Sequence, residues 1–242
     1  MSAKIKRRSI SQRSEMIYDL QEYGINPDTR EIFLHSHIDS AEDDEIGVDF
    51  RMATTFTKNL RLLTTLNKKP IVVHMHTFGG VWEDGMAIYD AIKSCKDTQI
   101  TILAYAHARS MSSIILQAAD IRVFMPNSVY MMHWGEAEFA GQGKSVAADA
   151  KEYMKDHERM IDLYAEVSAD GPKWEGITDH VRRMTIDKMI DDKVECYMSP
   201  REAIDYGFGD AVLGDEGFET IDSLFRYRKE YFDYDYPEEG GE

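Results

Sequence analysis

One interrupted apolar segment limits most strongly what this chain can fold into. Residues 101–120 read TILAYAHARSMSSIILQAAD, where the apolar run over residues 100–105 gives way to small and polar residues and then resumes as SMSSIILQAA. This pattern predicts a buried strand, a tight elbow and a buried helix, with Ser110 at the elbow. A serine there can cap the helix, which is its commoner use, or it can be a nucleophile whose neighbouring helical amides stabilise an oxyanion. This segment alone favours capping.

A similar strand-turn-helix pattern lies upstream, in KPIVVHMHTFGGVWEDGMAIYDAIKSC. It predicts a strand over residues 71–75, a turn that contains Gly79 and Gly80, and a helix over residues 82–94. Paired glycines allow unusual backbone dihedrals and a close approach to a ligand, so their amides can face a carbonyl oxygen. A lone pair of glycines is also compatible with a plain turn.

A third segment, IRVFMPNSVYMMHWGE, follows the elbow. It predicts a short strand that ends at Asn127 and Ser128, a second strand over residues 129–132, and His133 at the end of that second strand. Taken alone, a histidine at a strand end is more often a core residue with satisfied hydrogen bonds than a catalytic base.

Taken together, the three segments resemble the proteolytic subunit of Clp protease, of the ClpP-like serine protease family within the crotonase-like superfamily. GGVWEDGMAIYDAI is similar to the glycine-pair and helix motif, ARSMSS to the nucleophile motif, and MPNSVYMMH to the segment that ends in the catalytic histidine. Their order and spacing also agree, and the resemblance extends over about residues 30–212. It implies an α/β fold, a spiral of β-β-α units with a protruding handle helix, here expected over about residues 145–168.

The resemblance also implies a serine protease mechanism at residues of this chain. Ser110 corresponds to the nucleophile and His133 to the general base. The oxyanion would be held by the amides of Gly80 and Met111, with Gly79 shaping the turn.

The acid of the implied triad departs from the family pattern. The family places an aspartate four residues before the serine of its closing motif, which is similar to CYMSPREAIDYGFGDAV, and this chain has Glu195 at that position. Glutamate is one methylene longer than aspartate, and Ser-His-Glu triads occur in other serine hydrolases. Asp191 and Asp192 are nearby and remain alternative acids.

Two further departures lie next to the implied site. Phe78 stands where the family usually has a proline before the glycine pair, and we expect it to reshape the substrate groove. Arg109 stands where small residues usually precede the nucleophile. A buried charge is costly unless it is paired, so we expect Arg109 to lie at a rim or against an acidic partner.

Composition excludes several other classes of protein. The formal net charge of −16 argues against nucleic-acid binding. No apolar run is long enough to span a membrane. Cys95 and Cys196 are too few for a disulfide framework, so we expect reduced thiols. We therefore expect a cytoplasmic protein, and a phage gene is one source considered for it.

Histidine pairs on two predicted strands raise the question of a metal site. His35 with His37, and His74 with His76, stand two residues apart, so each pair would point to one face of its strand. No acidic or cysteine ligand is tied to them by the sequence. We therefore expect no metal and no cofactor.

Alternating strand and helix patterns, beginning with a strand over residues 30–39 and a helix over residues 47–66, predict right-handed crossovers on a largely parallel sheet. We divide the chain into a basic arm with a short helix (residues 1–25), a protease domain (residues 26–215) and an acidic, aromatic tail (residues 216–242).

The predicted function is a serine endopeptidase that cleaves polypeptides inside an oligomeric chamber and whose core needs no ATP. The resemblance implies a homo-oligomeric ring, either a heptamer or a stacked double ring, with an ATPase unfoldase as a candidate partner. We expect the chain to bind neither nucleic acid nor a membrane. A catalytically inactive structural subunit and a crotonase-type acyl-CoA enzyme are the alternatives.

Overall fold

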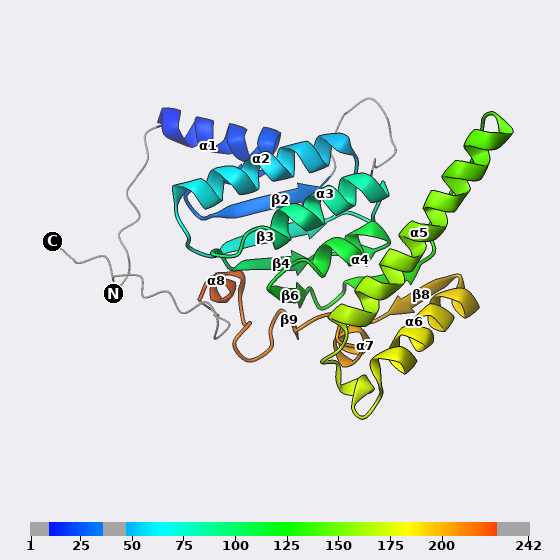
Figure 1. Cartoon of the computed structure of the whole chain (residues 1–242). Coiled ribbons are helices and arrows are strands. Elements are labelled where there is room, and N and C mark those ends of the chain that lie inside the picture. Colours follow the sequence, from blue (N-terminus) through cyan, green and yellow to red (C-terminus); the bar gives the residue numbers. More distant parts are fainter. Residues whose placement is uncertain (1–9, 36–46, 227–242) are drawn as a thin grey trace.

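The computed structural model describes residues 10–35 and 47–226, which form two β-sheets with helices around them (Figure 1). The larger sheet has six strands in the order β1-β2-β3-β4-β6-β9, in which β1 is antiparallel and the others are parallel. Its strands are β1 (Ile25–Asn26), β2 (Glu31–His35), β3 (Ile71–His76), β4 (Ile100–Ala104), β6 (Ile121–Phe124) and β9 (Ala211–Val212).

A smaller sheet of three strands carries the elbow and the histidine segment. It consists of β5 (His107–Arg109), β7 (Val129–His133) and β8 (Glu195–Met198), with β7 in the middle. β5 runs parallel to β7, whereas β8 runs antiparallel to it.

The helices are distributed over both sides of the larger sheet and around the smaller one (Figure 1). They are α1 (Ile10–Tyr23), α2 (Phe50–Leu66), α3 (Trp82–Lys93), α4 (Met111–Leu116), α5 (Gly143–Val167), α6 (Asp179–Lys193), α7 (Pro200–Asp205) and α8 (Ile221–Leu224), with a short 3-10 helix η1 (Pro172–Trp174). α2 and α3 lie against one face of the sheet and α8 against the opposite face.

The central strands are buried on both faces, which explains their nearly continuous apolar sequences. In β3, Val73 and Met75 pack into the core beneath α2 and α3, while Val72 packs on the other face. In β4, Ile102 and Leu103 divide between the two faces in the same way. This alternation follows from the two-residue period of a strand, so both clusters are needed to cover the sheet.

α5 has its buried residues in its C-terminal half, from His157 to Ala165. Its N-terminal half therefore projects away from the body, as Figure 1 shows for the green helix at the right. The helix predicted over residues 145–168 thus has the protruding geometry that the resemblance implies. Met154, on the projecting half, is 48% exposed.

The start of the predicted tail packs onto the domain. Phe218 and Leu224 are buried in the cluster on the face of the larger sheet opposite α2 and α3. The side chain of Thr220 caps α8 by accepting a hydrogen bond from Ser223 N. The remainder of the tail, residues 227–242, lies outside the described residues, and so does most of the basic arm.

The path of the chain into the elbow differs from the sequence prediction. We expected the strand over residues 100–105 to lead directly into the elbow, but β5 stands between β4 and α4 and belongs to the smaller sheet. The prediction failed because residues 107–109, with the sequence HAR, carry too little apolar alternation to indicate a strand. Of the strand predicted over residues 30–39, the described part is β2.

Of the two histidine pairs considered for a metal, His74 has a carboxylate and a hydroxyl as partners. His74 Nε2 lies 2.9 Å from Glu31 Oε1, and His74 Nδ1 lies 3.0 Å from the hydroxyl of Tyr105. His37 lies outside the described residues. Within residues 10–35 and 47–226, no group of three or more His, Cys, Asp or Glu side chains is placed to hold a metal ion. Over the same residues, no helix has the length and apolar character that a membrane crossing requires.

Candidate active site

The parallel pairing of β5 with β7 brings Ser110 and His133 together. Parallel strands end at the same edge of a sheet, and Ser110 N donates a hydrogen bond of 3.0 Å to Met131 O just beyond β5. His133, the last residue of β7, places its Nε2 atom 2.7 Å from Ser110 Oγ. Ser110 precedes α4 but makes no side-chain cap bond to it. Of the two uses considered for this serine, the structure therefore has the histidine contact and not the cap.

The backbone of Ser110 is strained, and its neighbours hold it in place. Its φ of 50° is unusual for a residue other than glycine and costs about 1–3 kcal/mol, so it persists only where the surroundings enforce it. Ser112 Oγ accepts from Arg109 N at 2.9 Å and donates to Arg109 O at 2.7 Å. Ser113 Oγ donates to Ser110 O at 2.6 Å, so the hydroxyl of Tyr164, also at 2.6 Å, must be the donor to Ser113 Oγ.

A buried chain of hydrogen bonds links α4 to the closing motif. Gln117 Nε2 donates to Ser113 O at 3.1 Å and to Phe208 O at 3.2 Å. Its Oε1 atom accepts from Arg122 Nη1 at 2.8 Å. Arg122 in turn pairs with both carboxylate oxygens of Asp210, at 2.8 Å and 3.2 Å. The closing motif therefore supports the helix that follows the elbow.

The glycine-pair turn lies directly against the elbow. A Cβ atom on Gly79, whose φ is +119°, would stand 2.7 Å from Ser110 Cβ and 3.0 Å from Met111 N. A Cβ atom on Gly80 would stand 2.3 Å from Val48 N. Only glycine permits this close approach.

Two backbone amides at this contact have no partner in the described part of the chain. Met111 N is the first amide of α4, and such amides have no acceptor within their own helix. Gly80 N is likewise without an acceptor there, although Val48 anchors the turn by donating to Gly79 O at 2.6 Å and accepting from Val81 N at 2.8 Å. Gly80 and Met111, the residues predicted for the oxyanion, thus offer two free donors near Ser110.

Among the three candidate acids, Glu195 is the residue that lies opposite His133. The antiparallel register of β7 and β8 pairs these two residues directly. Asp191 and Asp192 lie at the exposed end of α6, where the charge of Asp191 acts on His157. Glu195 Oε2 accepts a hydrogen bond of 2.9 Å from the hydroxyl of Tyr197. Within the described residues, no carboxylate forms a hydrogen bond or ion pair with His133.

Burial has the largest effect on the pKa of His133. Burial lowers the pKa of His133 below its usual value, and the charges of Glu195 and then Glu136 only partly offset this effect. Desolvation outweighs both carboxylates, so the net shift of the pKa is downward, although the charge of Glu195 acts in the direction expected of a nearby acid. Glu136 was not predicted; its place three residues after His133 was the available signal.

Arg109, expected at a rim or against an acidic partner, is half-buried and has an aromatic partner. Its guanidinium carbon lies 5.5 Å from the centre of the Tyr197 ring. Tyr197 was not identified from the sequence, although the alternation of β8 places it on the same face as Glu195. Phe78, beside the glycine pair, is 39% exposed, which leaves its ring free to line a groove.

The base of α5 contacts the segment that follows the histidine. The hydroxyl of Tyr153 donates to Trp134 O at 3.1 Å, and the ring of Trp134 stacks on His157 at an interplanar angle of 13°. Trp134 directly follows His133, so the projecting helix packs against the residue next to the candidate base.

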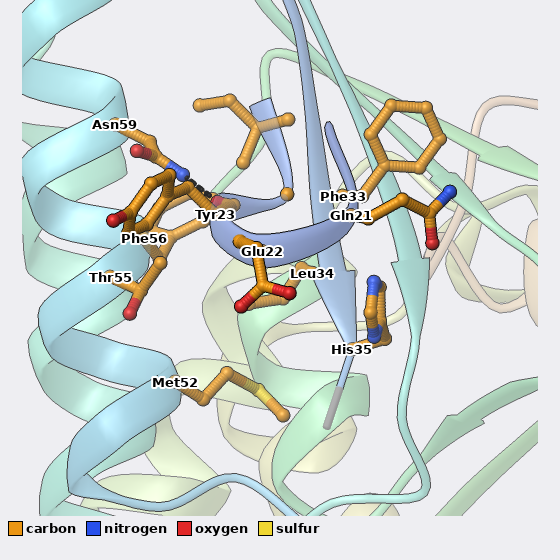
Figure 2. A pocket seen from close by; sticks show the side chains of 12 residues that line it. Gln21, Glu22, Tyr23, Phe33, Leu34, His35, Met52, Thr55, Phe56 and Asn59 are labelled. Carbon is orange, nitrogen blue, oxygen red and sulfur yellow. Dashed lines mark hydrogen bonds between the residues drawn. The ribbon is translucent and has the colours of Figure 1, made fainter. Parts of the chain in front are cut away.

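The cavity in Figure 2 lies elsewhere in the fold. It measures about 340 Å³ and is lined by the end of α1, β2 and α2. At one side Asn59 Nδ2 donates to Tyr23 O. Its lining includes neither Ser110 nor His133, so it is separate from the site described above.

Comparisons with known proteins identify the family of the chain. The profile of the Clp protease family matches residues 22–216. The chain is 31% identical over 169 residues to the ATP-dependent Clp protease proteolytic subunit of Deinococcus radiodurans, covering 69% of this chain and 76% of that protein. A solved structure of a ClpP1 mutant from Listeria monocytogenes has a TM-score of 0.63 and 25% identity, and the match covers 82% of this chain and 96% of that one. The predicted α/β fold is confirmed, and the chain belongs to the Clp protease family.

Proposed function

We propose that this chain is a serine endopeptidase in which Ser110 is the nucleophile and His133 the general base. The observation that carries the proposal is the 2.7 Å contact between His133 Nε2 and Ser110 Oγ at a strained elbow. A serine hydroxyl becomes a strong nucleophile only when a base removes its proton.

Each step of the proposed reaction has a group in this chain. His133 Nε2 takes the proton as Ser110 Oγ attacks the carbonyl carbon of the scissile peptide bond. The negative oxygen of the tetrahedral intermediate accepts hydrogen bonds from Gly80 N and Met111 N. His133 then gives the proton to the leaving amine, and an acyl-enzyme remains. A water molecule, deprotonated by His133, releases the second product and restores Ser110.

We assign Glu195 the role of the acid. Glu195 is paired with His133 in the register of β7 and β8, and its charge favours the imidazolium that forms when His133 accepts the proton. Glu195 would accept a hydrogen bond from His133 Nδ1 during the reaction, because catalytic hydrogen bonds are often long before substrate binds.

The chamber and its partners belong to the same proposal. The protein from Deinococcus radiodurans is named as the proteolytic subunit of an ATP-dependent protease. We propose that this chain forms a homo-oligomeric ring, single or stacked, that acts on unfolded polypeptides delivered by an ATPase unfoldase. The projecting half of α5 supports this, since it leaves Met154 without cover in one chain.

An inactive structural subunit is the second candidate function. The observation in its favour is that Glu195 contacts Tyr197 and does not contact His133. A crotonase-type acyl-CoA enzyme would not need a serine paired with a histidine and is the weakest of the three alternatives. A fluorophosphonate probe separates them, because it reacts only with an activated serine.

The first prediction concerns the nucleophile. Replacing Ser110 with alanine should reduce hydrolysis of an unfolded polypeptide such as casein by about a thousandfold or more and should abolish fluorophosphonate labelling. The fold should persist, because Ser110 Oγ contacts His133 and does not cap the helix. Ser145→Ala, at an exposed serine of α5, is the matched control and should behave as the unmodified protein. Substantial turnover in Ser110→Ala would contradict the assignment.

The second prediction concerns pH. Activity requires neutral His133, and burial lowers its pKa, so kcat/KM should rise with pH through a midpoint below about 6.5. Glu195→Gln should move the midpoint lower still, because the charge of Glu195 raises this pKa. A midpoint well above 6.5, or an upward movement in Glu195→Gln, would argue against His133 as the base.

The third prediction tests the oxyanion turn. Gly79→Ala should slow fluorophosphonate labelling about a hundredfold, because the added methyl group would collide with Ser110 and with the Met111 amide. Gly143→Ala is the control, since its Cβ would meet nothing within 4 Å. Circular dichroism should show a folded protein in both variants. Equal labelling rates would show that the turn does not support the reaction.

The fourth prediction concerns assembly. Light scattering should give the mass of an oligomer, several times the 27.8 kDa of one chain. Met154→Glu should weaken the assembly because Met154 is exposed on the projecting half of α5, whereas Ile177→Glu, at a 41% exposed residue outside it, should not. A monomer at all concentrations would refute the ring.

A further inference from the structure

We propose that Tyr197 is a positioning residue that holds the Glu195 carboxylate in place for His133. The inference rests on the proposed function, because it concerns how the acid of that site is oriented. It is carried by three side-chain relations on one face of the smaller sheet.

The strand register places the participants side by side. Arg109 pairs with Met131, which pairs with Tyr197, and two residues along β8 Glu195 pairs with His133. Alternate residues of a strand share a face, so these side chains lie on one face of the sheet. The opposite face is buried in the core and consists of Ala108, Tyr130, Met132, Cys196 and Met198.

The contacts run in sequence along this face. The guanidinium of Arg109 lies over the ring of Tyr197, 5.5 Å from its centre. The hydroxyl of Tyr197 donates to Glu195 Oε2 at 2.9 Å. The charge of Glu195 raises the pKa of His133. One side chain therefore connects the cation beside the nucleophile to the carboxylate opposite the base.

A hydrogen-bond partner restricts the rotamers of the Glu195 carboxylate. Glu195 is exposed and has one more rotatable bond than an aspartate, so without a hydrogen bond its carboxylate would move among several rotamers. A carboxylate can accept hydrogen bonds through both oxygens. Tyr197 occupies Oε2, which leaves Oε1 available to accept from His133 Nδ1.

The hydroxyl of Tyr197 contributes little to the stability of the fold. Tyr197 is 49% exposed and points away from the core, so its hydroxyl contributes little to packing. Cation–π contact with Arg109 restrains the ring. Removing the hydroxyl should consequently leave the fold and the position of the aromatic ring unchanged, while Glu195 loses its hydrogen bond.

The test compares two single variants, Tyr197→Phe and its control Tyr206→Phe. Tyr197→Phe is also combined with Glu195→Gln. Tyr206 is a matched control, because Lys173 lies 5.7 Å from its ring centre and its hydroxyl has no hydrogen-bond partner among the described residues. The readouts are kcat and KM on an unfolded polypeptide, and the pKa of His133 from NMR of the protein labelled at the histidine ring carbons.

Tyr197→Phe should lower kcat about tenfold with little change in KM, as expected for the loss of one hydrogen bond to a charged group. It should also lower the pKa of His133, because a freed Glu195 spends more time in solvent and raises that pKa less. In Glu195→Gln, the same substitution should change neither quantity further. Tyr206→Phe should match the unmodified protein.

Three results would overturn the proposal. They are an unchanged His133 pKa in Tyr197→Phe, an effect of equal size in Glu195→Gln, and a gain in kcat, which would mean that Tyr197 holds Glu195 away from His133. The titration of His133 does not require turnover. It therefore tests the connection from Tyr197 through Glu195 to His133 even in a protein that hydrolyses nothing. Absence of hydrolysis and of fluorophosphonate labelling in the unmodified protein would refute the proposed function separately.

Discussion

The pairing of β5 with β7 is the contact on which the candidate site depends. β5 has only three residues, yet it sets the direction in which the chain enters the elbow and the distance between Ser110 and His133. The positive φ of Ser110 persists because Ser112 and Ser113 bond the backbone on either side of it. Without these bonds, the residue would relax toward an ordinary conformation and its hydroxyl would leave the histidine.

Burial and nearby charge act in opposite directions on the pKa of His133, and burial has the larger effect. Desolvation lowers its pKa, and the carboxylates that oppose this effect stand at a distance. A base that is already neutral can accept a proton at once, while the nearby negative charge lowers the free energy of the imidazolium that results. In the proposed mechanism, Glu195 therefore matters more after proton transfer than before it.

The sequence predicted the parts of the fold that depend on local periodicity and on the resemblance. β3, α2, α3 and α5 follow from strand and helix periods, and Ser110 and His133 from motif positions. β5 was missed because a three-residue strand has too few positions to show a period. The contact of Tyr197 with Arg109 joins residues far apart in the chain, and no local pattern indicates such a pair. The same holds for the bond from Arg122 to Asp210.

The position of the closing motif has a consequence during synthesis. Ser110 and His133 leave the ribosome well before β8 and Asp210, which supply the facing acid and the last support of α4. A nascent chain therefore carries the serine and the histidine without the structure that holds them in working geometry. If the proposed mechanism holds, a copy of the chain would gain its activity only after residues 195–210 have been synthesised and folded.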